Sequence, residues 1–228
     1  MAVPTARVGA CQTEPIQFRI GFRHDRERSA EAPGRSRAAA HKAASHALSP
    51  AEFLARLDAR TEGPRTGILA LYEPSYDVWA DNERLAAGQP DSLFVGVTTV
   101  CGEGRDWALG VEINGYLGVT PELIVPLSAG TRLVSHYRNV NAVDRFYWVE
   151  DTDIRLNFGP LAPAYREGRT PDALVDVMSE AGFDLEQEAN LDVPTEAAFA
   201  LAERLTGVRV TMAVLEESTY ECGIARAG

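Results

Sequence analysis

The sequence contains little lysine, little cysteine and no long apolar run. Only one of its 22 basic residues, Lys42, is lysine, and the others are arginine. Its 3 cysteines are too few for a disulfide framework, so we expect reduced thiols and a cytoplasmic location. No run of about 18 apolar residues is present, and Met1 to Ala10 holds no apolar signal-peptide core, so neither a membrane span nor secretion is expected.

Motifs of cofactor and metal chemistry are absent as well. Gly102-x-Gly104 is followed by a predicted strand, whereas the dinucleotide fingerprint needs a helix there, and no Walker loop occurs. Asp151-x-Asp153 lacks the glycine and the terminal glutamate of a calcium loop. We therefore expect no cofactor and no metal site.

The net charge of −11 divides unevenly along the chain. Residues 1–48 carry +4 and residues 49–228 carry −15. The first segment has little apolar pattern, so we predict a basic, disordered leader, as an upstream start codon would produce, followed by one domain over residues 49–228. Nucleic acid could bind only through this Arg-rich leader, which lacks interleaved aromatic residues, so a nucleic-acid partner is not expected.

Start and stop signals divide the remainder into helices and hairpins. Ser49-Pro50 predicts a helix that ends before Gly63-Pro64, and Thr120-Pro121 predicts another, shortened by Pro126. Asn114-Gly115 predicts a tight hairpin with 116–119 as its returning strand. Thr170-Pro171-Asp172 predicts a further helix that ends at Gly182, and others are predicted over 195–205 and 211–217. Further strands are predicted over 93–100, 107–113, 132–139, 145–149, 154–158 and 220–224.

These elements predict the fold class. The strands come as hairpins and the helices are grouped late in the chain, which does not favour parallel winding. We predict an α+β fold with an antiparallel sheet of about 5–6 strands and with helices packed on one face.

Six runs of residues resemble one known family. They are N-G-Y-L-G-V-T-P-E at 114–122, L-S-A-G-T-R at 127–132, R-N-V-N-A at 138–142, W-V-E-D at 148–151, G-F-D-L at 182–185 and T-E-A-A-F-A-L-A-E at 195–203. In this order they resemble an uncharacterised family of high-GC, actinobacterial-type proteins, the domain of unknown function 6461, over residues 49–224. The resemblance implies no activity and no catalytic residue.

His136 is the one histidine beyond the leader, because the other three of the 4 lie before residue 49. It could act as a general base for a nucleophile such as Ser128 or Cys101, but no nucleophile elbow or cysteine signature surrounds either residue. A single histidine on a strand is more often a packed side chain. Glu112, in an otherwise apolar strand, would need Arg132 or Arg138 as a partner if it is buried.

The strongest polar cluster is Arg138, Asn139, Asn141 and Asp144. Asn and Asp favour turns by bonding their own backbone, and the chain must turn here. In the alternative interpretation these residues, together with Tyr116, form an interaction surface at a strand end.

Two functions from different classes follow. The first is a non-catalytic, cytoplasmic protein-interaction module, of the immunity or inhibitor type, whose acidic surface meets a basic partner. The alternative is a small hydrolase with a site around His136.

Overall fold

The protein folds as an antiparallel sheet with helices and a buried apolar cluster on each face. The computed structural model describes residues 16–20, 48–85, 91–113, 115–139, 141, 143–186 and 194–226, and of residues 16–20 it describes the backbone alone. The strands are β1 (Ile16–Ile20), β2 (Arg60–Thr66), β3 (Ser92–Gly102), β4 (Arg105–Ile113), β5 (Arg132–Arg138), β6 (Asp144–Glu150), β7 (Asp153–Phe158), β8 (Arg166–Glu167) and β9 (Thr219–Arg226). The helices are α1 (Pro50–Arg56), α2 (Tyr72–Asn82), α3 (Pro121–Leu127), α4 (Val175–Glu180), α5 (Pro194–Thr206) and α6 (Met212–Glu217), with short 3₁₀ turns η1 (Ile68–Leu71) and η2 (Leu117–Val119).

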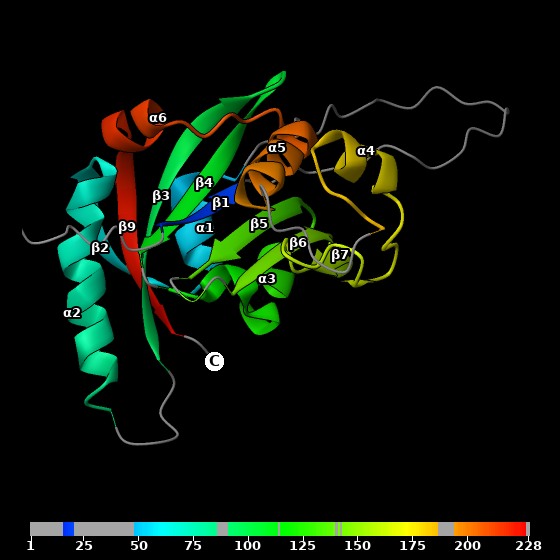
Figure 1. Ribbon diagram of the computed structural model, residues 1–228. Helices are drawn as coiled ribbons and strands as arrows, with labels where there is room; N and C mark the ends of the chain where they lie inside the picture. Colours follow the sequence, from blue (N-terminus) through cyan, green and yellow to red (C-terminus); the bar gives the residue numbers. More distant parts are fainter. Residues whose placement is uncertain are drawn as a thin grey trace, which may run out of the picture.

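The strands form one sheet in the order β2-β9-β3-β4-β1-β5-β6-β7-β8. Each neighbouring pair is antiparallel. The last strand in the sequence, β9, lies between β2 and β3 (Figure 1). The predicted α+β class with an antiparallel sheet is therefore confirmed, and the sheet has 9 strands, more than the number expected.

Helices cover both faces of the sheet, whereas one covered face was expected. Figure 1 shows α5 above the strands β5 and β6 and α3 below them. Successive residues of β6 alternate between two buried clusters: Phe146 and Trp148 join α4, α5 and α6, while Tyr147 and Val149 join α1 and α3. This alternation is what a strand pleated between two apolar layers requires.

Most predicted element starts are found, but α4 begins at Val175 and not at the predicted Thr170-Pro171. The Ser49 hydroxyl accepts a hydrogen bond from the Glu52 N–H, and the Glu52 carboxylate accepts one from the Ser49 N–H, a capping box that begins α1. The Pro121 start of α3 and the Thr211 cap of α6 are also present. Helix α1, however, ends at Arg56, and the chain then turns through Asp58 at a positive φ of 49°.

Two predicted elements are wrong. Residues placed in the last turns of the first helix belong to the edge strand β2, which pairs with β9 and tolerates Pro64 and a bulge because it lies at the sheet edge. The expected returning strand at 116–119 is the 3₁₀ turn η2. Leu117 is fully buried among α1 and α3, so packing rather than hairpin pairing sets its conformation.

The predicted leader lies mostly outside the described residues. Five of its residues, Ile16–Ile20, form β1 between β4 and β5. The prediction of disorder for the remaining leader residues falls outside the described ranges. Within those ranges, no helix is both long and apolar enough to cross a membrane.

Candidate functional site

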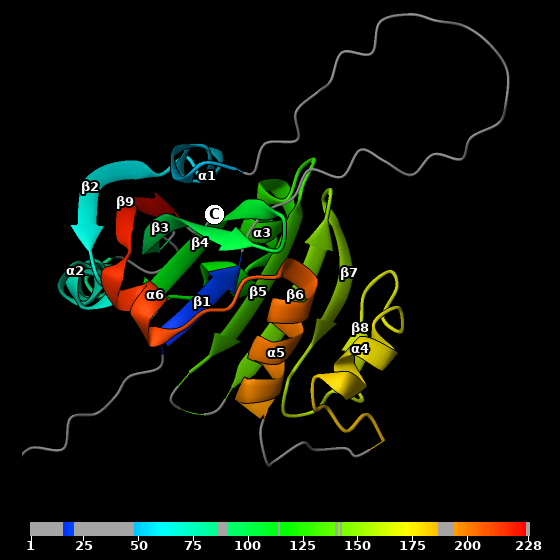
Figure 2. The same cartoon turned by 90° about the horizontal axis from the view of Figure 1, so that it is seen from above.

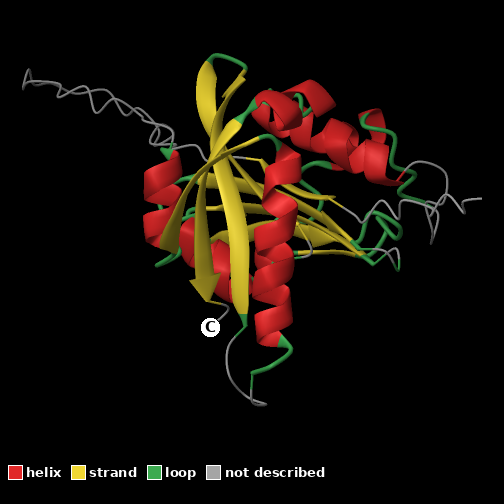
Figure 3. Ribbon diagram, turned by 90° about the vertical axis from the view of Figure 1, so that its left-hand side faces the viewer, coloured by secondary structure: helices red, strands yellow, loops and turns green. Residues whose placement is uncertain are grey.

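A cavity of about 360 Å³ lies between α2 and the ends of three strands. Helix α2 forms one wall, and it lies along the strands on this side of the sheet (Figure 3). The residues that precede β3, follow β4 and follow β5 supply the other walls. The side chains that give it its chemistry are Trp79, Asn82, Glu83, Asp91, Tyr116, Tyr137 and Asn139.

The sequence places α2 here through its own pattern. Ser75 is buried on the helix side that faces the sheet and its hydroxyl donates to the Leu71 carbonyl at 2.7 Å. Asn82, at the last turn, fixes the helix to β3, because its amide donates to the Ser92 carbonyl at 2.7 Å and its Oδ1 accepts from the Ser92 N–H at 2.9 Å. These two bonds fix the end of α2 to the start of β3 beside the cavity.

Tyr116 and Asp91 form the polar centre of the cavity. The Tyr116 hydroxyl donates a hydrogen bond to Asp91 Oδ2. Burial raises the pKa of Tyr116 to about 12, and the bond to Asp91 and the charges of Asp91 and Glu112 add to the shift. The carboxyl group of Glu112 lies beside the preceding residue, 3.0 Å from the position that a Cβ on Gly115 would take. Two acidic side chains, Asp91 and Glu112, therefore act on this phenol.

Aromatic and carboxylate side chains line the cavity. Trp79 is 46% exposed and Tyr116 is 36% exposed, although both are large side chains. Trp79 is held edge-on by Tyr76, with ring centroids 6.4 Å apart. Among the described lining residues the charged ones are Glu83 and Asp91, both acidic, and none is basic. Such a cavity suits an ammonium or guanidinium group, which carboxylates and aromatic faces both attract.

The titration of Tyr116 offers a direct test of this geometry. Replacing Asp91 with Asn removes the charge and the strong acceptor, so the pKa of Tyr116 is expected to fall from about 12, while burial keeps it above its ordinary value. Ultraviolet difference titration of the two proteins measures the change, and a Tyr116→Phe variant identifies the transition. An identical titration curve for Asp91→Asn would contradict the contact.

The predicted interaction residues fall into two groups. Tyr116 and Asn139 line the cavity. Arg138 instead pairs with Asp144 at 3.4 Å, and Asp144 is buried, which raises its pKa. Asn139 Oδ1 accepts from the N–H groups of Asn141 and Val143 at 3.0 and 2.9 Å, so the cluster builds the turn between β5 and β6.

His136 lies on β5 and packs against helix α5. Its ring packs edge-on against Phe199 of α5, with centroids 5.4 Å apart, and burial lowers its pKa to about 4, helped by the charge of Arg138. In the described part of the chain no group hydrogen-bonds to its Nε2 atom. The hydroxyl of Ser128 donates to the Val125 carbonyl, and the thiol of Cys101 donates to Asp106.

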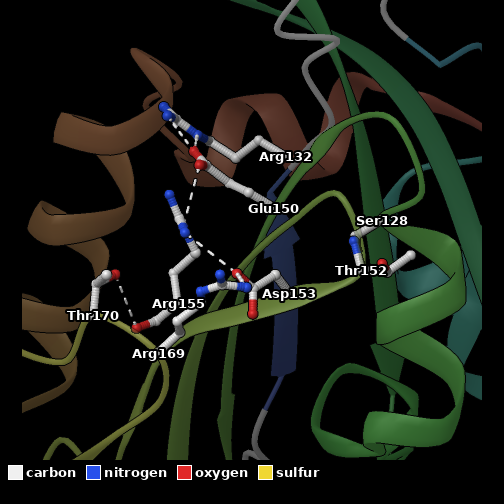
Figure 4. A network of polar contacts seen from close by, with 8 residues as sticks. All are labelled: Ser128, Arg132, Glu150, Thr152, Asp153, Arg155, Arg169 and Thr170. Carbon is white, nitrogen blue, oxygen red and sulfur yellow. Dashed lines mark hydrogen bonds and ion pairs between the residues drawn. The ribbon is translucent and has the colours of Figure 1, made fainter.

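A second polar cluster lies at the opposite end of β5, and Figure 4 shows it. Arg132 pairs with Glu150, Arg155 lies 3.6 Å from Glu150 and 3.3 Å from Asp153, and Arg169 lies 3.2 Å from Asp153. Each of these arginines faces a carboxylate, so the cluster joins β5, β6 and β7 to the segment after β8. Arg132 and Arg138, the two partners expected for Glu112, form ion pairs with Glu150 and Asp144.

The Asp151-x-Asp153 hairpin tip has structural partners as well. Asp151 Oδ1 accepts from the Gly130 N–H at 2.8 Å, and Thr152 donates its N–H to Ser128 at 3.0 Å. In the ranges that the structure describes, no group of three or more His, Cys, Asp or Glu side chains is arranged to hold a metal ion.

Sequence reasoning missed Trp79, Asn82, Glu83 and Asp91. The signal available was the spacing of Tyr72, Tyr76 and Trp79 at i, i+4 and i+7, which is typical of one helix face. No local pattern shows that this helix meets the ends of β3, β4 and β5.

Comparisons with known proteins give one result. The pattern of the Family of unknown function (DUF6461) matches residues 35–227. No curated protein and no solved structure matches the chain.

Proposed function

The chain belongs to the Family of unknown function (DUF6461), and from its own residues we propose that it is a non-catalytic, cytoplasmic protein-interaction module of the immunity or inhibitor type. Its partner is a basic protein, and the cavity beside α2 receives a basic side chain of that partner. The observation that carries the proposal is a cavity with aromatic walls and only acidic charged groups among its described lining residues.

Charge supports this proposal at two scales. Residues 49–228 carry a net charge of −15, a field that attracts a basic partner and speeds its capture. Within the cavity, Asp91 is oriented by the Tyr116 hydroxyl, so a carboxylate oxygen is already in place before a partner arrives. Preorganised charged groups of this kind contribute specificity as well as affinity.

Chemistry supports a basic side chain in particular. A guanidinium can bond a carboxylate with two parallel N–H groups and lie flat against an aromatic face. Glu83 and Asp91 supply the carboxylates, and Trp79 and Tyr116 supply the faces. In the described part of the chain no hydrogen bond joins His136 to a nucleophile, so nothing there favours the hydrolase alternative.

Affinity capture with the full chain tests the proposal. The wild-type protein is expected to retain a basic protein from an extract of its source organism, with retention that falls as salt rises. A Glu83→Gln/Asp91→Asn variant is expected to lose that protein. A Glu73→Gln/Asp77→Asn variant removes the same charge from exposed positions of α2 that do not line the cavity, so it should retain it.

Three outcomes would overturn the proposal. They are the capture of no basic protein, equal capture by both variants and the wild type, and loss of capture by the control variant as well.

A further inference from the structure

Strand β1 joins two halves of the sheet that would otherwise be separate. It pairs with β4 from Ile16↔Ile113 to Ile20↔Leu109 and with β5 from Phe18↔His136 to Ile20↔Val134. On its other side β4 pairs with β3, and β5 pairs with β6. Figure 2 shows β1 in blue between β4 and β5. Without it the sheet would consist of β2-β9-β3-β4 and β5-β6-β7-β8.

The two strand edges that face β1 are deeply buried. On β4, Leu109 and Val111 are fully buried, and on β5, Val134 and Ser135 are each 1% exposed. The edge of β5 is covered on both faces, because His136 packs against α5 and the Ser135 hydroxyl donates to the Gly118 carbonyl of η2 at 2.6 Å. An unpaired backbone N–H or C=O in such a site costs about 1–3 kcal/mol, so pairing with a strand stabilises both edges.

The strand that fills this place is distant in sequence from the elements around it. Residues 21–47 separate β1 from the start of the next described segment at Leu48. The family pattern begins at residue 35, so it includes β4 and β5 but not β1. Both acceptor edges thus lie within the matched residues, and β1 lies before the first of them.

We propose that the gap between β4 and β5 is a strand-acceptor site and that residues 16–20 of this chain occupy it as a detachable strand. The site recognises the segment through backbone hydrogen bonds to β4 on one side and to β5 on the other. This is strand addition to two sheet edges at once. The sequence I-Q-F-R-I alternates apolar and polar residues, the pattern of an extended segment between two different faces. The same segment supplied as a free peptide therefore replaces the tethered strand.

A variant of the full chain with the two changes Phe18→Pro and Arg19→Pro tests this site. Adjacent residues of a strand direct their N–H groups to opposite neighbours, so the two prolines remove one donor toward β4 and one toward β5. Amides of 109–113 and 134–136 are expected to exchange faster with deuterium in this variant, while amides in the β3–β9 pair keep their protection. A labelled peptide of residues 13–23 should restore the slow exchange.

The peptide's affinity separates a site from a non-specific contact. The peptide should bind the double variant at least about tenfold more tightly than the wild type, in which the tethered strand competes at high effective concentration. The same peptide carrying both prolines should bind neither protein. Equal binding to both proteins, or no binding to either, would overturn the proposal.

Exchange in the wild-type chain keeps the test decisive if the double variant does not fold. A detachable strand opens without global unfolding, so the amides of 109–113 and 134–136 should exchange with a lower opening free energy than those of the β3–β9 pair. Equal opening free energies would contradict a detachable β1.

Discussion

Lowering the pH from 7 to 4 is expected to destabilise the folded protein by about 3 kcal/mol through His136 alone. Burial against α5, aided by the charge of Arg138, lowers the pKa of His136 to about 4, from 6.5 for an unperturbed histidine. Between these values the unfolded chain binds a proton that the folded chain does not. The stability that His136 contributes is therefore present above pH 6.5 and is lost as the pH falls toward 4.

Chemical denaturation of the wild type and of His136→Leu at a series of pH values measures this effect. The variant should lose the part of the pH slope between 6.5 and 4 that His136 supplies. Asp144, whose pKa burial raises, contributes with the opposite sign in the acid range and is present in both proteins, so it cancels in the comparison. Parallel pH profiles for the two proteins would show that His136 is not the group responsible.

Replacing Gly207 with Ala is expected to destabilise the protein by roughly 2–5 kcal/mol. Gly207 follows the end of α5 with φ at 70°, a conformation that favours glycine. A Cβ at this position would lie 2.3 Å from the backbone N of Glu103 and 2.5 Å from its Cβ. The end of α5 and the turn between β3 and β4 would therefore have to move apart.

Gly104→Ala is the matched control for this prediction. Gly104 also has a positive φ, of 75°, but a Cβ there would meet nothing within 4 Å. It should therefore cost only the backbone strain, about 1–2 kcal/mol. Denaturant unfolding of both variants measures the difference, and equal destabilisation would show that the close approach of Glu103 to Gly207 has no energetic weight.

Local signals predicted the parts of the fold that local physics decides. The Ser49-Pro50 start of α1 and the proline start of α3 each act within one helical turn, and each lies where the sequence placed it. Hairpin strands β3–β4 and β6–β7 are likewise joined by short turns.

Elements that depend on distant partners could not be predicted in the same way. Strand β2 contains Gly63 and Pro64 and becomes a strand through pairing with β9, more than a hundred residues later. The position of β9 between β2 and β3 also leaves no local trace. Helices on both faces follow from the continuous apolar strands, such as β4, whose burial on both faces can be recognised once the sheet is known.

The residues of the candidate site likewise divide into those with a local sequence signal and those without one. Tyr116 and Asn139 stand in or beside turn motifs and were singled out from the sequence, and both line the cavity. Trp79 and Asp91 carry no motif, because their role arises only when α2 lies against the strand ends. A cavity built from four separated segments is a property of the tertiary structure.

The most direct test of the proposed function is the affinity of the full chain for a blocked arginine amide, which stands in for a basic side chain. Trp79 lies in the cavity wall and its fluorescence reports occupancy. We expect saturable binding that weakens about tenfold or more in Glu83→Gln/Asp91→Asn, since charge-assisted hydrogen bonds contribute about 1.5–3 kcal/mol each. Glu73→Gln/Asp77→Asn should bind as the wild type does. Binding that is absent, or equal in the wild type and the cavity variant, would contradict the account.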